Sequence, residues 1–232
     1  MAEVRNIDTR ERILDAAERL FMAHGYDGTS MRQITGEAAV NLAAVNYHFG
    51  SKEMLMKEVF RRRLGWLNEE RLRALDEMEA AAAGHPLKPS QIVDGFFGTL
   101  LRMGSDESRG GITFLRLLGR TLTEPSEFIR TVLSDEYAGL SERYKAALFK
   151  ALPDVPKAEI VWRFHFMLGA TAYAIAGVDA LNVGVDWGTG DSERTDAAER
   201  LLPRLMSFLL GGLRAPLPQF AAAGDSAAAR AA

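Results

Sequence analysis

Apolar residues recur at spacings of three and four along every long segment of this chain, and no convincing period-two alternation interrupts them. Such spacings place apolar side chains on one face of a helix, whereas a half-buried strand needs strict alternation. Ala, Leu, Arg and Glu, all good helix formers, dominate these segments, and clusters of Gly, Pro, Asp and Ser separate them. The pattern therefore predicts an all-α protein.

The composition narrows the class of protein further. Hydrophobic residues make up 47% and charged residues 25% of the 232 positions, a balance typical of a water-soluble globular chain. The chain has no cysteine, which excludes disulfides, thiolate metal sites and cysteine nucleophiles. The longest apolar-and-small stretch, residues 166–178, is too short to cross a membrane, and the first residues lack the apolar core of a secretory signal. We expect a cytoplasmic protein with no membrane partner.

The first part of the chain predicts one ordinary helix, two short helices and a long one. Capping residues at Asp8, Ser30, Asn41 and Ser51 mark four helix starts. The predicted helices run from near Asp8 to a stop at Gly25, and over residues 31–38, 42–49 and 52–83. Two short helices joined by about three residues are the arrangement of a helix-turn-helix, whose second helix enters a DNA major groove. Residues 1–52 are therefore predicted to form a helix-turn-helix DNA-binding domain of three helices.

The second short helix, residues 42–49, supplies the predicted DNA contacts. Val45 and Phe49 are expected to point inward, so the other side chains face away from the core. Asn46 can hydrogen-bond an adenine edge, and alanine or leucine side chains can touch a thymine methyl group. Side chains and free amides near helix starts can reach phosphate oxygens. The candidates from this reasoning are Ser30, Leu42, Ala43, Ala44, Asn46, Tyr47, His48 and Lys52.

The stretch from Thr9 to about Leu64 resembles the DNA-binding domain of the tetracycline-repressor (TetR) family. The resemblance rests on ILDAAERLFMAHGYDGTSMRQI and on VNLAAVNYHFGSKEML, in which Tyr-His-Phe is followed after two residues by Lys-Glu. It implies an all-helical homodimer whose divergent C-terminal domain binds a small molecule and forms the dimer. It also implies that Tyr47, His48 and Lys52 contact phosphates, and that Ser30 or Thr29 anchors the second helix to the DNA backbone.

Three positions depart from that family pattern: Ala39 at the helix turn, Thr35 where the family usually carries an alanine, and Asn46 in place of the first of two aromatic residues before the histidine. The family often has Ala-Gly-Val at the turn between the short helices, and this chain has Ala38-Ala39-Val40. If the turn needs a left-handed backbone, alanine costs on the order of 1 kcal/mol there. The usual basic footprint is also missing, because residues 1–60 carry seven Lys or Arg against nine Asp or Glu. DNA binding would then depend on where the positive groups lie and on two copies acting together.

Residues 53–213 are predicted to form a helical ligand-binding and dimerisation domain, followed by a flexible tail over residues 214–232. Its five further helices are predicted over residues 90–103, 111–123, 126–152, 156–182 and 192–212. Two of them are the most informative. The helix from Pro156 to Asn182 carries small residues at helical spacing, and the helix from Ser192 to Gly212 has a wider apolar surface than one packing face requires. This predicts a homodimer through these two helices. The alternative is that the small residues only allow close packing within one subunit.

The middle helices are predicted to enclose a small hydrophobic effector, although the same apolar residues equally suit a core. Arginines within apolar stretches could clamp an anionic group, or could form internal salt bridges instead. The candidate ligand-binding residues are Phe96, Leu100, Phe114, Arg116, Arg120, Trp162, Arg163, Phe166 and Tyr173. In addition, VNLAAVNYHFGSK and LPDVPKAEIVWRFHFMLGA resemble the fatty-acid-responsive, PsrA-like branch of the family. That resemblance implies a long-chain fatty acid or acyl-CoA as effector.

The sequence carries no recognisable catalytic constellation. No two of its four histidines share a helix at a spacing of four, and phosphate-binding and nucleophile-elbow motifs are absent. We therefore predict no catalytic residue, metal or cofactor. The prediction is a ligand-responsive transcriptional regulator, a repressor by analogy, that binds a palindromic operator as a dimer. A helical dimer that binds other proteins, or a helical enzyme acting on lipid or acyl groups with His165 as base, are the alternatives.

Overall fold

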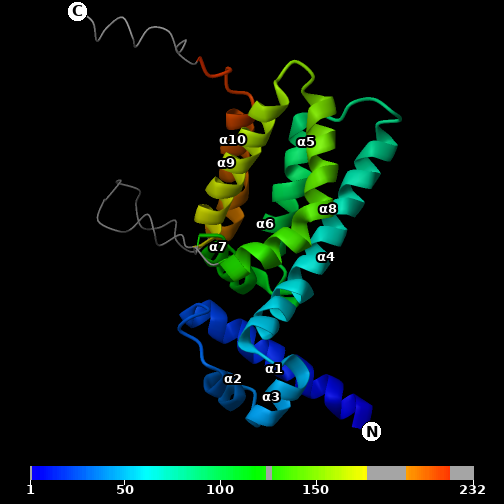
Figure 1. Ribbon diagram of the computed structural model, residues 1–232. Coiled ribbons are helices and arrows are strands. Elements are labelled where there is room, and N and C mark those ends of the chain that lie inside the picture. The colour runs from blue at the N-terminus through cyan, green and yellow to red at the C-terminus, as the bar shows by residue number, and fades with distance from the viewer. Residues whose placement is uncertain (1, 124–126, 177–196, 220–232) are drawn as a thin grey trace, which may run out of the picture.

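The computed structural model describes residues 2–123, 127–176 and 197–219, and this part of the chain is helical without strands. Three helices form a small domain at one end, and helix α4 leads from it into a larger bundle (Figure 1). The all-α prediction is confirmed. Among the described residues, no helix is both long and apolar enough to cross a membrane.

The N-terminal domain contains α1 (Ala2–His24), α2 (Met31–Glu37) and α3 (Leu42–Phe49), and α4 (Lys52–Ala81) packs against it. The starts predicted at Ser30, Asn41 and Ser51 are confirmed as N-caps. The start predicted at Asp8 is wrong, because α1 already begins at Ala2 and Asp8 lies within it. A capping pattern inside a sequence that continues to favour helix does not end the helix.

The larger bundle consists of eight further elements. They are α5 (Pro89–Val93), the π-helix η1 (Asp94–Gly98), α6 (Thr99–Met103), the 3₁₀-helix η2 (Glu107–Arg109), α7 (Gly111–Thr123), α8 (Glu127–Ala151), α9 (Lys157–Ala176) and α10 (Ala197–Leu213). The regular helix predicted over residues 90–103 is therefore corrected, because its middle turn widens into a π-helix. The predicted start at Ser126, end at Asn182 and start at Ser192 lie outside the described residues, as do residues 220–232 of the tail.

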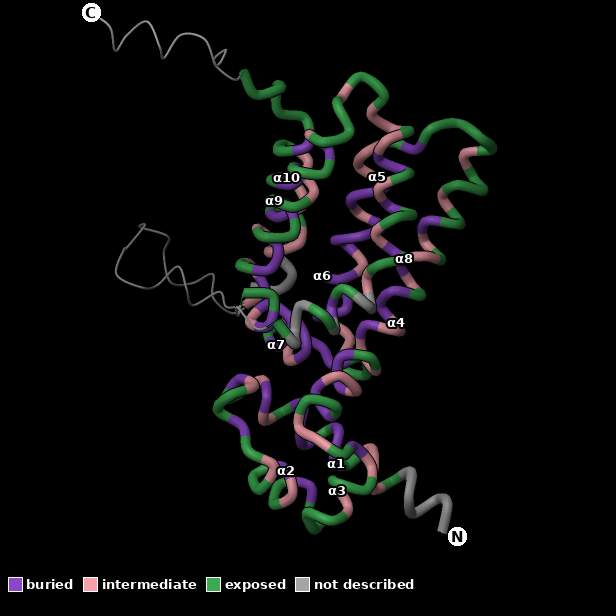
Figure 2. Tube along the Cα trace, in the orientation of Figure 1, coloured by how far each residue is buried: buried purple, intermediate pink, exposed green. Residues whose placement is uncertain are grey.

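Buried residues run without a break from the small domain into the bundle (Figure 2). The N-terminal half of α4 buries Leu55, Val59 and Phe60 against the small domain, and Phe60 meets Phe114 of α7 with ring centroids 6.1 Å apart. Helix α4 thus belongs to both parts of the molecule. The domain boundary after residue 52 stays a prediction, although it coincides with the first residue of this shared helix.

Helices α7 and α9 pack closely because Gly119 lies between them. A Cβ atom at Gly119 would come within 2.4 Å of the backbone nitrogen of Ala176. Only a residue without a side chain allows this approach. The close contact fixes α7 and α9 as two neighbouring walls of the bundle interior.

Candidate functional site

Three capping hydrogen bonds fix the starts of the two short helices. The Ser30 side chain accepts from the backbone N–H of Gln33 at 3.3 Å, and the Gln33 side chain accepts from the Ser30 N–H at 2.8 Å. The Asn41 side chain accepts from the Ala44 N–H at 2.8 Å. Each cap satisfies amides that a helix start leaves without partners. The helix-turn-helix is therefore built from local hydrogen bonds as well as from its core.

The turn between α2 and α3 contains a left-handed alanine. Ala39 has φ of 51°, a backbone conformation that favours glycine. The Arg12 guanidinium supports this turn from α1, because its Nη2 donates to the carbonyl of Ala38 at 2.6 Å and to that of Ala39 at 3.0 Å. A charged donor thus fixes the end of α2 at the strained position.

Helix α3 presents a polar and aromatic face to solvent. Val45 and Phe49 are buried, as predicted, so that Leu42, Ala43, Asn46 and Tyr47 are exposed and Ala44 and His48 are half-buried. Tyr47 is 78% exposed, which is unusual for a large aromatic side chain with no role at the surface. Its ring lies against that of His48, with centroids 5.3 Å apart. This face has the size, position and side chains that a major-groove helix needs.

The structure uses Thr29 and Lys52 inside the protein. Thr29 is 1% exposed, and its hydroxyl donates to the carbonyls of Gly25 and Leu20 at 2.8 and 3.0 Å. Lys52 Nζ donates to the Thr29 carbonyl at 2.8 Å and lies 4.1 Å from the centre of the Tyr26 ring. The Thr29 side chain therefore fastens the turn before α2 to the end of α1, and Lys52 fastens the same turn to the start of α4. The expectation that the Thr29 side chain touches DNA is corrected, because its hydroxyl is buried and already bonded.

The acidic residues of α1 are neutralised on the side that faces α4. Arg62 of α4 pairs with Asp15 at 2.8 Å and with Glu18, and Arg63 pairs with Glu18 at 3.2 Å. Burial alone lowers the pKa of Arg62, but hydrogen bonds and charges from Glu18 and Asp15 outweigh it and raise that pKa. Arg32, which sequence reasoning did not select, is exposed on α2 and has no ion pair among the described residues. It adds a cation to the helix-turn-helix.

A cavity of about 760 Å³ lies in the bundle between α4, η1, α6, α7, α8 and α9. Of the predicted ligand-binding residues, Phe96 and Leu100 line it. Tyr137 also lines it, and so does Arg71, which sequence reasoning missed because it lies on a long helix with mostly polar neighbours. Burial raises the pKa of nearby Tyr144 to about 12, so its hydroxyl stays protonated and donates to the Arg71 carbonyl at 2.8 Å.

The other predicted ligand-binding residues lie outside this cavity. Phe114 is fully buried against Phe60, and Arg116 is exposed. Arg120 Nη1 donates to the Met22 carbonyl of α1 at 2.7 Å, so it joins the two parts of the molecule. Arg163 forms an ion pair with Glu159 at 2.9 Å, which is the internal salt bridge that the sequence analysis gave as the alternative to ligand binding. Arg163 also donates to the Leu213 carbonyl.

Three predicted ligand-binding aromatics face solvent on α9 instead. Trp162, Phe166 and Tyr173 are 58%, 63% and 56% exposed, and their spacing of four and seven places them on one helix face. Phe208 of α10, the helix beside α9, is 67% exposed. We call these four residues the aromatic face. Exposed aromatics gathered in this way mark an interaction surface rather than a cavity wall.

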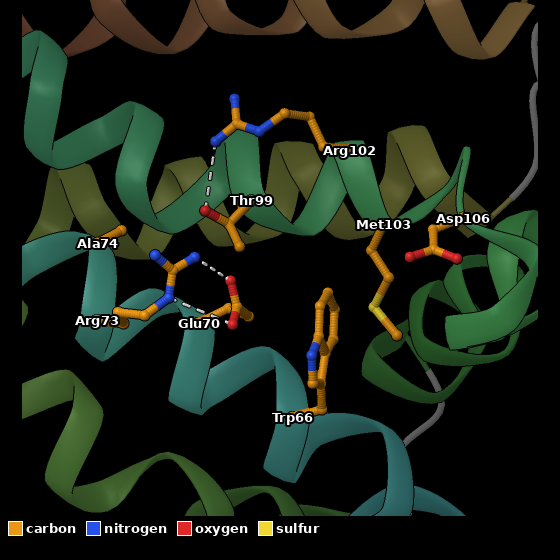
Figure 3. A pocket seen from close by; sticks show the side chains of 8 residues that line it. All are labelled: Trp66, Glu70, Arg73, Ala74, Thr99, Arg102, Met103 and Asp106. Atoms are coloured by element: carbon orange, nitrogen blue, oxygen red, sulfur yellow. Dashed lines mark hydrogen bonds and ion pairs between the residues drawn. The ribbon is translucent and has the colours of Figure 1, made fainter.

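A smaller hollow of about 300 Å³ lies between α4 and α6 (Figure 3). Its charged groups are already used: Arg73 pairs with Glu70 and with Glu77, and Arg102 pairs with Asp94 at 3.0 Å and hydrogen-bonds Thr99. In the described part of the chain, no cluster of His, Asp and Glu is suited to hold a metal ion. The larger cavity is therefore the stronger ligand site.

The short helices with an exposed α3 define a helix-turn-helix protein. The helical bundle forms a second domain, with a cavity large enough for a small-molecule ligand. Residues 13–59 match the family of bacterial regulatory proteins named tetR, and residues 94–212, just over half of the chain, match the tetracyclin repressor-like C-terminal domain. The chain belongs to the tetracycline repressor (TetR) family. Members of the family are transcriptional regulators and not enzymes.

Similar proteins agree with this assignment. The HTH-type transcriptional regulator LmrA of Bacillus subtilis is 43% identical over 65 residues, which are 25% of this chain and 35% of LmrA. The fatty acid degradation regulator FadR of Bacillus halodurans has the same fold with a TM-score of 0.62 and 14% identity, over 90% of this chain and 97% of that chain. FadR of Bacillus subtilis, crystallised in complex with stearoyl-CoA, gives a TM-score of 0.60 and 14% identity, over 87% and 98%.

Proposed function

We propose that the protein is a ligand-responsive transcriptional regulator that binds a palindromic operator as a homodimer. The observation that carries this proposal is the exposed face of α3, where Asn46 and Tyr47 point outward from a capped helix-turn-helix. Asn46 would hydrogen-bond a base edge, Leu42, Ala43 and Ala44 would touch thymine methyl groups, and Ser30, Tyr47 and His48 would contact phosphates. Lys52 would act by holding α4 against the turn, and Arg32 would supply a further phosphate contact.

The aromatic face supports the homodimer. The exposed aromatics lie on α9 and α10, the two helices that the sequence predicts as the interface. Gly169 on α9 and Gly211 on α10 have open space around them, which lets a second copy approach closely. Two copies of this face would bury each other in an isologous contact. The dimer would present one α3 helix to each half of the operator.

The effector would bind in the larger cavity and act on DNA affinity through α7 and α4. The cavity is lined by Leu118 and Thr121 of α7, while Arg120 of the same helix holds the Met22 carbonyl of α1. A ligand that fits better when α7 has shifted would favour the shifted arrangement and lower operator affinity by that difference. The fatty-acid-related FadR neighbours support a long-chain fatty acid or acyl-CoA as effector. Relatives that are named repressors support repression as the sign of regulation.

The test starts with selection of binding sites from a random duplex pool by the full-length protein. Fluorescence anisotropy on the selected operator then compares Asn46→Ala with Tyr47→Phe on a panel of operator point mutants. Asn46→Ala should change preference at one base position by about 1–3 kcal/mol, whereas Tyr47→Phe should weaken binding evenly across sequences. Thr131→Val removes a hydroxyl from an exposed position of α8, outside α3, the cavity lining and the aromatic face, and should leave operator affinity unchanged.

Equal, sequence-blind losses for both variants would remove Asn46 as a base reader. If no duplex is enriched, the helical dimer that binds other proteins becomes the better account. That account is distinguished by a partner that still binds when both Asn46 and Tyr47 are changed.

A further inference from the structure

Helix α4 places a buried positive charge in the wall of the larger cavity. Arg71 is 1% exposed, although arginine is rarely buried to this extent unless it is paired. Within the described residues, no carboxylate lies within ion-pair distance of its guanidinium. Arg163, also buried, shows the usual solution, with Glu159 at 2.9 Å. Arg71 therefore differs from its closest counterpart in this fold.

The hydrogen-bond contacts of Arg71 use its Nε and Nη1 atoms and supply no opposite charge. Its Nε donates to the Phe96 carbonyl at 2.9 Å, and its Nη1 makes longer contacts of 3.4 Å to Asn68 Oδ1 and 3.5 Å to the Tyr137 hydroxyl. The guanidinium carbon lies 4.0 Å from the centre of the Phe96 ring. All of these partners are uncharged, and a buried charge without an opposite charge is costly. An anion bound beside Arg71 would supply what the protein lacks.

Two further features of the wall indicate a ligand. The hydroxyl of Thr171 lines the cavity at 3% exposure and has no hydrogen-bond partner in the described structure. Unpartnered buried polar groups are rare, and each calls for an explanation. Phe96, the acceptor of Arg71, belongs to the π-helix η1, and π-helical turns occur frequently at functional sites.

The cavity changes character from its inner end to its opening. Arg71, Phe97 and Leu118 are buried members of the lining, whereas Leu122, Leu168 and other lining residues are exposed. The surface of the cavity as a whole is mostly apolar. A bound molecule would thus meet a positive charge inside and apolar side chains along the rest of its length.

We propose that the cavity binds an amphipathic monoanion, in which an apolar body carries one compact anionic group such as a carboxylate, and that Arg71 pairs with this group. The Thr171 hydroxyl hydrogen-bonds the ligand as a second polar contact. The proposal rests on the proposed function only in taking this cavity as the effector site. It names the chemical class of the effector and the residue that selects it. A cation or an uncharged hydrocarbon would leave the charge of Arg71 unmatched.

The test measures binding to the full-length protein by isothermal titration calorimetry without DNA. The probes are dodecanoate, dodecanol and dodecanoyl-CoA, which share one chain but differ at the head. Dodecanoate should bind at least about tenfold more tightly than dodecanol, because a charge-assisted contact to Arg71 is available only to the acid. Arg71→Met should reduce that preference to about one, and Thr171→Val should weaken dodecanoate a few-fold. Arg116→Met, an exposed arginine of α7, should change nothing.

Equal affinity for dodecanoate and dodecanol, no binding of dodecanoate, or an unchanged preference in Arg71→Met would overturn the proposal. Dodecanoyl-CoA provides a further check. If it binds as tightly as dodecanoate to the unchanged protein, and also as tightly as dodecanoate to Arg71→Met, the anionic group is bound by another part of the protein and the assignment of Arg71 fails. If Arg71→Met does not fold, the ratio of the affinities for dodecanoate and dodecanol is measured in the unchanged protein and in Arg71→Lys. The proposal then requires that both proteins prefer dodecanoate. Operator release is measured separately, so a failure of DNA regulation leaves the result on the cavity intact.

Discussion

At the scale of single residues, the turn between α2 and α3 contains a conflict between sequence and backbone. Ala39 adopts φ of 51°, and the left-handed region costs an L-residue roughly 1–2 kcal/mol. Two contributions offset this cost. Arg12 donates hydrogen bonds to the carbonyls of Ala38 and Ala39, and the side chains of Ile34 and Val45 on the flanking helices are buried. The departure from the family's Ala-Gly-Val pattern is thus a strained position rather than a different turn.

Ala39→Gly should therefore stabilise the protein. Glycine removes the left-handed penalty but adds freedom to the unfolded chain, so the free energy of unfolding should rise by about 0.5–1 kcal/mol. Urea denaturation of the two proteins measures this difference. Ala43→Gly, on the exposed and regular part of α3, provides the comparison and should destabilise by about 1 kcal/mol. A loss of stability in Ala39→Gly would show that the turn is not strained.

The residues of the site divide into those that sequence could predict and those that it could not. The outward face of α3 follows from helical periodicity, so Asn46 and Tyr47 were predicted correctly as exposed. Thr29 looks like a surface residue in the sequence, yet it is buried by contacts to α1. Arg71 resembles the other arginines of α4, and only the packing of η1 and α8 around it reveals its burial. Periodicity specifies a face, but not which neighbours cover it.

At the scale of elements, α7 connects the cavity with the helix-turn-helix. One part of it lines the cavity through Leu118 and Thr121, and Gly119 keeps it close to α9. The same helix meets the small domain through Phe114 and through the hydrogen bond from Arg120 to the Met22 carbonyl. Sequence periodicity predicted α7 at its observed bounds. Periodicity could not predict that α7 contacts both the cavity and the small domain, because the second contact is made with α1, which is far away in the sequence.

Arg120→Met should loosen this connection while it preserves the apolar stem of the side chain. The lost bond joins a guanidinium to a carbonyl in the last turn of α1, so the free energy of unfolding should fall by about 1–3 kcal/mol. Amides around Met22 should exchange with deuterium faster, whereas amides of α9 should not change. Arg116→Met on the same helix is the control. Unchanged exchange around Met22 would mean that the apolar contact of Phe60 with Phe114 alone joins the domains.

At the scale of the whole molecule, the helix-turn-helix lies at one end, and α9 and α10, which carry the aromatic face, belong to the larger bundle (Figure 1). The helix-turn-helix region carries no net positive charge, since residues 1–60 hold seven basic and nine acidic groups. One such domain would bind DNA weakly, because phosphate neutralisation supplies much of the affinity of DNA-binding proteins. Joining two copies makes the second half-site contact intramolecular and raises overall affinity. Under the proposed function, tight operator binding therefore requires the dimer.

Phe166→Glu should separate the dimer and reduce operator binding together. In a two-fold contact the new carboxylates enter the interface twice, and burying an unpaired charge is strongly unfavourable. Sedimentation equilibrium should show the mass fall from twice the chain mass to the 25.5 kDa of one chain. Affinity for a full operator should approach the weak affinity for a half-site, while circular dichroism stays unchanged because Phe166 is 63% exposed within one chain.

Ala80→Glu, on the exposed end of α4, introduces the same charge away from the aromatic face and should preserve both properties. The two readouts together separate the possible accounts of this surface. A Phe166→Glu protein that stays dimeric places the interface elsewhere. One that becomes monomeric yet keeps full operator affinity would show that a single helix-turn-helix suffices, which its charge balance argues against. The combined loss is expected because, in the proposed dimer, the strength of DNA binding depends on a contact made by α9 and α10 and not by the helix-turn-helix itself.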